Sequence, residues 1–136
     1  MIIFLDPDPK RAVLAYQRMN EEDRSNTIWC RTFEEGQTSL WVYKNELTKV
    51  YMEHDLSGTP YMNTRSEESG MEIVRYLEKL ETHHGDVFPV YTKMKWVIHT
   101  WNEIAAPKML KRMRKIGLTV DWVPFGTGTK WEQNEN

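Results

Sequence analysis

Residues 2–5 read Ile-Ile-Phe-Leu and are followed at once by Asp6-Pro7-Asp8-Pro9. A short uninterrupted apolar run of this kind is typical of a strand that is buried on both faces of a parallel sheet. The next residues predict a helix, because Asp8 suits the N-cap and Pro9 suits the first helical position. The apolar residues that then recur at helical spacing are Ala12, Ala15, Tyr16 and Met19.

The rest of the chain repeats this alternation of strand and helix. Further strands are predicted at 27–31, 49–52, 96–98 and 118–123. Three more helices are predicted: one opened by a capping box of Thr32 and Glu35, one capped by Ser66, and one from near Pro107 to Gly117. We expect irregular structure at 57–64 and 83–95.

Alternating strands and helices imply an α/β fold, in which a mostly parallel five-stranded sheet lies between two layers of helices. We predict one flavodoxin-like three-layer domain over residues 1–125, with strand order 2-1-3-4-5, and a loose C-terminal tail at 126–136. In this arrangement the strand order reverses between the first and third strands. Polar groups that follow the carboxyl ends of these strands therefore face one crevice, where we expect the functional site.

The composition is that of a soluble globular protein, with 136 residues of which 40% are hydrophobic and 28% charged. No stretch approaches the roughly 18 apolar residues that a membrane helix needs. Eighteen basic and twenty acidic residues give a formal net charge of −2, which excludes a general DNA coat but permits a local basic patch. Cys30 is the only cysteine and no secretion signal opens the chain, so we expect a cytoplasmic protein without an internal disulfide.

The predicted crevice collects four carboxylates, Asp6 and Asp8 after the first strand and Glu53 and Asp55 after the third. Carboxylates that lie close together raise one another's pKa values unless a cation neutralises them, and hard oxygen ligands suit Mg²⁺ or Mn²⁺. We therefore expect a metal site anchored by Asp6 and Asp55 and completed by Asp8 or Glu53. The alternative is that Asp6 and Asp8 only shape the turn and cap the helix.

Two histidines, His54 and His99, follow predicted strands, where an imidazole can accept or donate a proton near neutral pH. Together with Asp55 they are the candidate catalytic residues, and the alternative is that each histidine only holds a loop in place. The candidate phosphate-binding residues are Thr100, Asn102 and Lys108, the last at the start of a helix that also carries Lys111, Arg112, Arg114 and Lys115.

The alternative interpretation of the basic face of this last helix is an ordinary solvated surface. The tryptophans are expected to pack in the core and at its rim, with Trp101 the strongest candidate for another role.

Four short motifs stand at strand ends or helix starts: Phe4-Leu5-Asp6, Glu53-His54-Asp55-Leu56, residues 69–74, and Ile98-His99-Thr100-Trp101-Asn102. Together they resemble the receiver-like cyclic-phosphate processing domains (the cREC family), relatives of the response-regulator receiver fold. The resemblance extends over most of residues 1–125 and implies a single receiver-like domain. Two positions depart from the family pattern, because Pro7 separates acids that are usually adjacent and Glu53 stands where the family usually has Asp.

The resemblance implies processing of cyclic phosphates on nucleic-acid ends or nucleotides. With the candidate residues above, we predict a Mg²⁺- or Mn²⁺-dependent phosphoesterase whose partner is a cyclic nucleotide or an RNA end with a cyclic phosphate. The alternative is an inactive pseudo-receiver that binds a partner protein or sequesters a cyclic nucleotide. Ordinary phosphorelay is disfavoured, because Glu53 is a poor phospho-acceptor and Val123-Pro124 replaces the Lys-Pro of signalling receivers.

Overall fold

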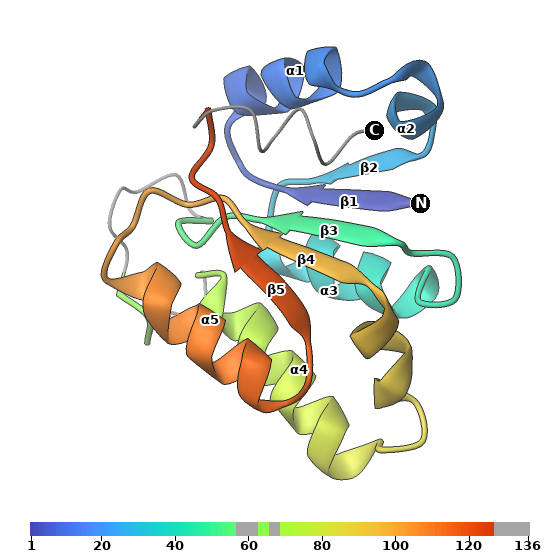
Figure 1. The fold of residues 1–136 in the computed structure, drawn as a ribbon, viewed down its shortest axis with the longest axis vertical. Helices are drawn as coiled ribbons and strands as arrows, with labels where there is room; N and C mark the ends of the chain where they lie inside the picture. Colours follow the sequence, from blue (N-terminus) through green and yellow to red (C-terminus); the bar gives the residue numbers. More distant parts are fainter. Residues whose placement is uncertain (57–62, 66–68, 127–136) are drawn as a thin grey trace.

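The computed structural model describes residues 1–56, 63–65 and 69–126. Five strands form one sheet in the order β2-β1-β3-β4-β5, and all neighbouring pairs are parallel (Figure 1). The strands are β1 (Ile2–Leu5), β2 (Thr27–Cys30), β3 (Lys49–Met52), β4 (Lys95–Ile98) and β5 (Thr119–Trp122). The predicted α/β fold class and strand order are confirmed.

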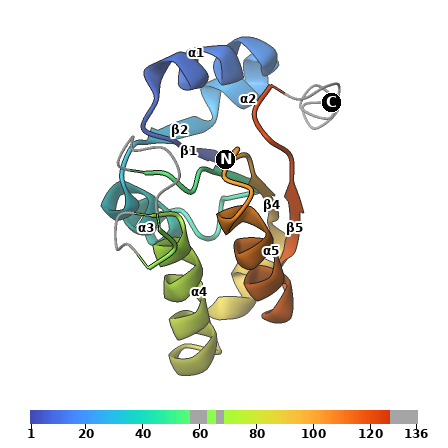
Figure 2. The same cartoon turned by 90° about the vertical axis from the view of Figure 1, so that its left-hand side faces the viewer.

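Helices cover both faces of this sheet, as Figure 2 shows most clearly. Helix α1 (Pro9–Arg18) lies on one face, and α3 (Phe33–Val42), α4 (Met71–His83) and α5 (Ala105–Lys115) lie on the other. The strand side chains alternate between these layers, so that Ile3 and Leu5 pack towards α3 and α4 while Ile2 and Phe4 pack towards α1. Burial on both faces explains why the central strand β1 reads as a continuous apolar run.

Three predicted helix ends are confirmed by their caps. The Asp8 side chain accepts a hydrogen bond from the Lys10 N–H at the start of α1, and the Thr32 side chain accepts one from Glu35 at the start of α3. Helix α5 ends before Gly117, whose φ of 95° is a conformation that favours glycine. The predicted Ser66 cap is wrong, because α4 begins at Met71 with Gly70 in the N-cap position. Ser66 itself and residues 127–136 of the predicted tail lie outside the described residues.

Two short helical segments were not predicted. Helix α2 (Glu21–Ser25) buries none of its residues, so it has no apolar periodicity to detect, and it is held by an Asn20 side chain that accepts from the Asp23 N–H. The 3₁₀ helix η1 (Phe88–Lys93) lies within the stretch read as irregular and buries Phe88 and Tyr91, three residues apart.

The strands are aligned residue for residue, and this alignment positions the site. Leu5 pairs with Met52, and Met52 pairs with Ile98, so β1, β3 and β4 end side by side. The next residue of each strand therefore stands at the same level on the carboxyl edge. In the described part of the chain, no helix is both long and apolar enough to span a bilayer.

Candidate active site at the carboxyl edge of the sheet

Asp6 is the fully buried residue at the centre of the site. Arg11 donates to its carboxylate from Nε (2.7 Å to Oδ2) and from Nη2 (2.9 Å to Oδ1), and the Asp8 N–H donates to Oδ1 at 2.8 Å. The Nε2 of His99 lies 2.7 Å from Oδ2. Burial alone would raise the pKa of Asp6, but the hydrogen bonds with His99 and Arg11 outweigh it and lower the pKa below its usual value. Asp6 is therefore an anion in the folded protein.

Arg11 is a site residue that sequence reasoning missed. Besides Asp6, its guanidinium lies 3.4 Å from Asp8 Oδ2 and 3.7 Å from Glu53 Oε2. Burial lowers the pKa of Arg11, but the neighbouring carboxylates raise it by more, so the group stays a cation. The guanidinium thus places a positive charge beside all three carboxylates. The sequence signal that could have identified Arg11 is its place as a basic residue in the first turn of the helix that follows Asp6.

Glu53 connects the two halves of the site. Its Oε1 accepts hydrogen bonds from the backbone N–H of His54 (2.9 Å) and of Asp55 (3.4 Å), while Oε2 lies 3.9 Å from His99 Nε2. Ligand atoms of Asp6, Glu53 and His99 all lie within 4.8 Å of one another, and all three residues are buried. Two carboxylates in this position fit a hard divalent cation, although the cation would compete with Arg11 for both of them.

His54 and Asp55 form a second pair beside this cluster. The His54 ring is fully buried, with Nδ1 2.8 Å from Asp55 Oδ1. The Asn102 amide nitrogen lies 3.2 Å from the same oxygen and donates to it. Among residues 1–56, 63–65 and 69–126, no group hydrogen-bonds to His54 Nε2. A carboxylate on Nδ1 favours the tautomer whose Nε2 carries the lone pair, so Nε2 can accept a proton.

The His99 ring is held in place by two aromatic residues. The Phe4 ring stacks on it, with the centroids 5.0 Å apart and the planes 8° from parallel. Phe125 packs against it edge-on, at 6.1 Å. The orientation of Nε2 towards Asp6 is thus fixed by packing as well as by the hydrogen bond.

One family model matches residues 1–115 of the chain, and its description is the cyclic-phosphate processing receiver domain. The chain belongs to this family. The match begins before β1 and ends with α5, so it contains every residue of the site described above except Phe125. The name of the family links this receiver domain to cyclic-phosphate processing. No curated protein and no solved structure matches the chain.

The remaining predicted site residues of the receiver domain lie around the two clusters. Asp8 caps α1 and faces Arg11, and its side chain is one-third exposed. Thr100 is buried, and its hydroxyl accepts from the Asn102 N–H at 3.1 Å. Asn102 orders the start of α5, because its Oδ1 accepts from the N–H of Ala105 at 2.9 Å. Lys108 is exposed on α5. The structure thus brings together Asp6, Glu53 and His99, and next to them His54, Asp55 and Asn102.

Gly70 has a structural role in the receiver domain that the sequence did not reveal. Its N–H donates to the His54 carbonyl at 2.7 Å, which brings the start of α4 against the end of β3. A Cβ atom at this position would lie 2.4 Å from the carbonyl oxygen of Glu53. Only glycine therefore permits this approach, which holds the backbone of both Glu53 and His54.

Proposed function

We propose that this receiver domain hydrolyses a cyclic phosphate ester at the carboxyl edge of its sheet. The observation that carries the proposal is the presence of two buried histidines, each paired with a carboxylate, at the ends of neighbouring strands: His54 with Asp55, and His99 with Asp6. Opening a cyclic phosphate requires one group that takes a proton from water and one that protonates the leaving oxygen. Imidazoles perform both tasks near neutral pH, and the family name supports the substrate class.

In this proposal each histidine has its own role. His54 Nε2 accepts the proton of the attacking water, while Asp55 holds Nδ1 and stabilises the imidazolium that forms. The water oxygen bonds to phosphorus and a ring P–O bond breaks. His99, held as an imidazolium with its Nε2–H against Asp6, protonates the leaving oxygen from Nδ1 and becomes a neutral imidazole. The product is an open phosphate monoester.

Arg11 is the cation that balances the charge of the phosphoryl group. It borders both buried carboxylates, and its side chain is 31% exposed, so a phosphate arriving from solvent meets it first. A surface hollow of about 560 Å³ is lined by residues 31–35 at the start of α3 and by Pro7 and Leu56, which are the chain neighbours of Asp6 and Asp55.

A Mg²⁺ or Mn²⁺ ion is part of the proposal, with Asp6 and Glu53 as its oxygen ligands. When bound, it would polarise the phosphoryl oxygen. Arg11 neutralises the same two carboxylates, so we propose that the ion and the guanidinium compete for them. His99 keeps its proton role in either case.

The test is hydrolysis of 2′,3′-cyclic nucleotides, RNA ends with a cyclic phosphate, and cyclic dinucleotides, each with EDTA and with added Mg²⁺ or Mn²⁺. We expect turnover of at least one substrate, and a loss of about 100-fold in kcat for His54→Gln. His84→Gln is the matched control, because His84 is exposed at the end of α4. Wild-type turnover in His54→Gln would overturn the mechanism, and stoichiometric binding of an intact ligand would establish the inactive pseudo-receiver instead.

A further inference from the structure

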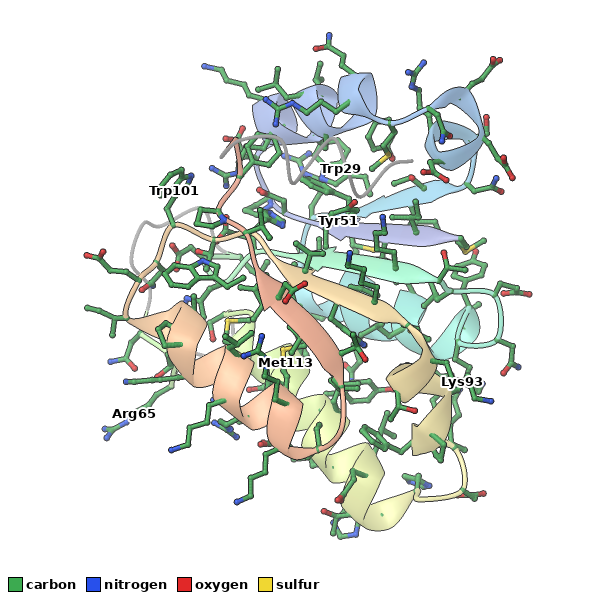
Figure 3. The ribbon with its side chains drawn as sticks, in the orientation of Figure 1. Trp29, Tyr51, Arg65, Lys93, Trp101 and Met113 are labelled. Carbon is green, nitrogen blue, oxygen red and sulfur yellow. The ribbon has the colours of Figure 1, made fainter. Side chains whose placement is uncertain are left out.

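Trp101 is an exposed side chain within a buried segment of the site. Its neighbours in the chain, Thr100 and Asn102, are buried, whereas Trp101 is 56% exposed. Figure 3 shows its side chain projecting from the β4–α5 connection, away from the sheet. A large apolar ring at this position covers no core, so packing does not explain it.

The Trp101 ring is nevertheless held in one orientation. Its Nε1–H donates to the carbonyl oxygen of Phe125 at 3.0 Å, and the N–H of Phe125 donates to the carbonyl of His99 at 2.9 Å. The Phe125 ring also packs edge-on against the His99 ring. The indole is therefore anchored to the same backbone that holds a proposed proton donor.

Helix α5, which follows Trp101 in the chain, carries an exposed stripe that is first apolar and then basic. Ile104, just before the helix, is 66% exposed. Residues that follow at helical spacing on the same face are Lys108, Lys111 and Lys115, all exposed.

The two arginines of α5 are not part of this stripe. Arg112 binds Glu78 of α4, with Nε 2.9 Å from Oε2, and Arg114 donates to the Val120 carbonyl. Both arginines thus have partners within the protein, and the positive charge of the exposed lysines favours an anionic ligand over an apolar protein surface.

We infer that Trp101 stacks on the nucleobase adjacent to the cyclic phosphate. The inference rests on the proposed function and deepens it, because it makes a nucleotide unit the preferred substrate over a cyclic phosphate on a bare sugar. An exposed, pre-oriented indole suits this task, since every base has a face on which it can stack. The exposed lysines of α5 provide charge for the phosphates of further nucleotides.

The experiment compares two substrates that differ only in the base: a nucleoside 2′,3′-cyclic phosphate and 1-O-methylribose 2′,3′-cyclic phosphate. For Trp101→Ala we expect KM for the nucleoside substrate to rise about tenfold with little change in kcat, and the kinetics of the base-free substrate to stay unchanged. Trp101→Phe should retain most of the affinity. Trp41→Ala is the matched control, because Trp41 is 42% exposed on α3 and carries Lys44 over its ring.

Equal effects of Trp101→Ala on both substrates, or no effect on either, would overturn the inference. If wild-type protein hydrolyses neither substrate, the proposed function fails, and the stacking is then tested by calorimetry with a nucleoside 3′-monophosphate. Weaker binding by Trp101→Ala, with restored binding by Trp101→Phe, would support the stacking inference independently of the proposed function. Binding that is the same in all variants would overturn it.

Discussion

Arg11 binds the buried carboxylate of Asp6 through two nitrogens, with Nε 2.7 Å from Oδ2 and Nη2 2.9 Å from Oδ1. This paired geometry is the strongest form of charge-assisted hydrogen bonding available to a carboxylate. It joins the first turns of α1 to the end of β1, so the helix that covers one face of the sheet is fixed directly to the site.

Replacing Arg11 with Met should destabilise the protein by about 2 kcal/mol, because a buried carboxylate loses its charged partner. Urea unfolding of both proteins at pH 7 measures this difference. Arg11→Lys should recover only part of it, since an ammonium group cannot form both bonds. Unfolding free energies equal to wild type in both variants would show that the ion pair contributes nothing to stability.

The same Arg11→Met variant should bind Mn²⁺ more tightly than wild type, because the guanidinium and the ion compete for Asp6 and Glu53. Calorimetry and the Mn²⁺ electron paramagnetic resonance signal report binding without any activity assay. Asp6→Asn should abolish the site. Identical Mn²⁺ affinity in wild type, Arg11→Met and Asp6→Asn would show that no ion binds to these carboxylates.

The lowered pKa of Asp6 predicts an acid-dependent loss of stability. In the unfolded chain an Asp carboxyl titrates at about pH 3.9, and in the folded protein Asp6 releases its proton at a lower pH. Its stabilising contribution is therefore complete above the unfolded value and disappears as the pH falls through the folded value. Thermal unfolding between pH 7 and pH 2.5 should show a shallower decline for Asp6→Asn than for wild type, and parallel curves would contradict this assignment.

Gly70→Ala should damage both stability and activity. The added methyl group would lie 2.4 Å from the Glu53 carbonyl oxygen, so the backbone of residues 53–54 must shift, at a cost of about 1–3 kcal/mol. Gly85→Ala is the control, since the nearest atom to its new Cβ is an ordinary 3.6 Å away. Urea unfolding and cyclic-phosphate hydrolysis should separate the two variants, and equal behaviour would show that the close approach at Gly70 is unimportant.

Asn102 has two roles that substitution can separate. Asn102→Ala removes the acceptor at the start of α5, which should cost about 1 kcal/mol, and also the donor to Asp55. Asn102→Asp keeps the acceptor but places a second carboxylate near Asp55, so stability should be largely retained while the pH–rate profile shifts. Unfolding curves and pH–rate profiles of both variants test this, and an unchanged profile in Asn102→Asp would remove Asn102 from the proton-transfer network.

The fold was predictable because its determinants are local. The run at residues 2–5 and the caps at Asp8 and Thr32 define elements from their own residue types. Helix α2 and η1 were missed because they lack such local signals. Helix α2 has no buried face, and η1 is too short to show a helical period.

The edge of the sheet at which the candidate site lies could be predicted from the sequence, but the contacts between its side chains could not. Parallel strands bring the residues that follow them to one edge, and this placed Asp6, Glu53 and His99 together. The chain is no longer extended after a strand ends, so alternation does not tell which way a side chain turns. That Glu53 faces Arg11 and His99 while Asp55 faces His54 depends on tertiary packing, including the approach of Gly70.

The residue-for-residue alignment of β1, β3 and β4 makes strand length itself a determinant of chemistry. Deleting one residue from any of these strands would draw the following side chain back by about 3.3 Å and turn it to the opposite face. Residues added at the other edge of the sheet, before a strand begins, would leave the row of Asp6, Glu53 and His99 unchanged. Attempts to redesign or diversify this domain should therefore direct insertions to the amino-terminal edge and keep the four-residue strands intact.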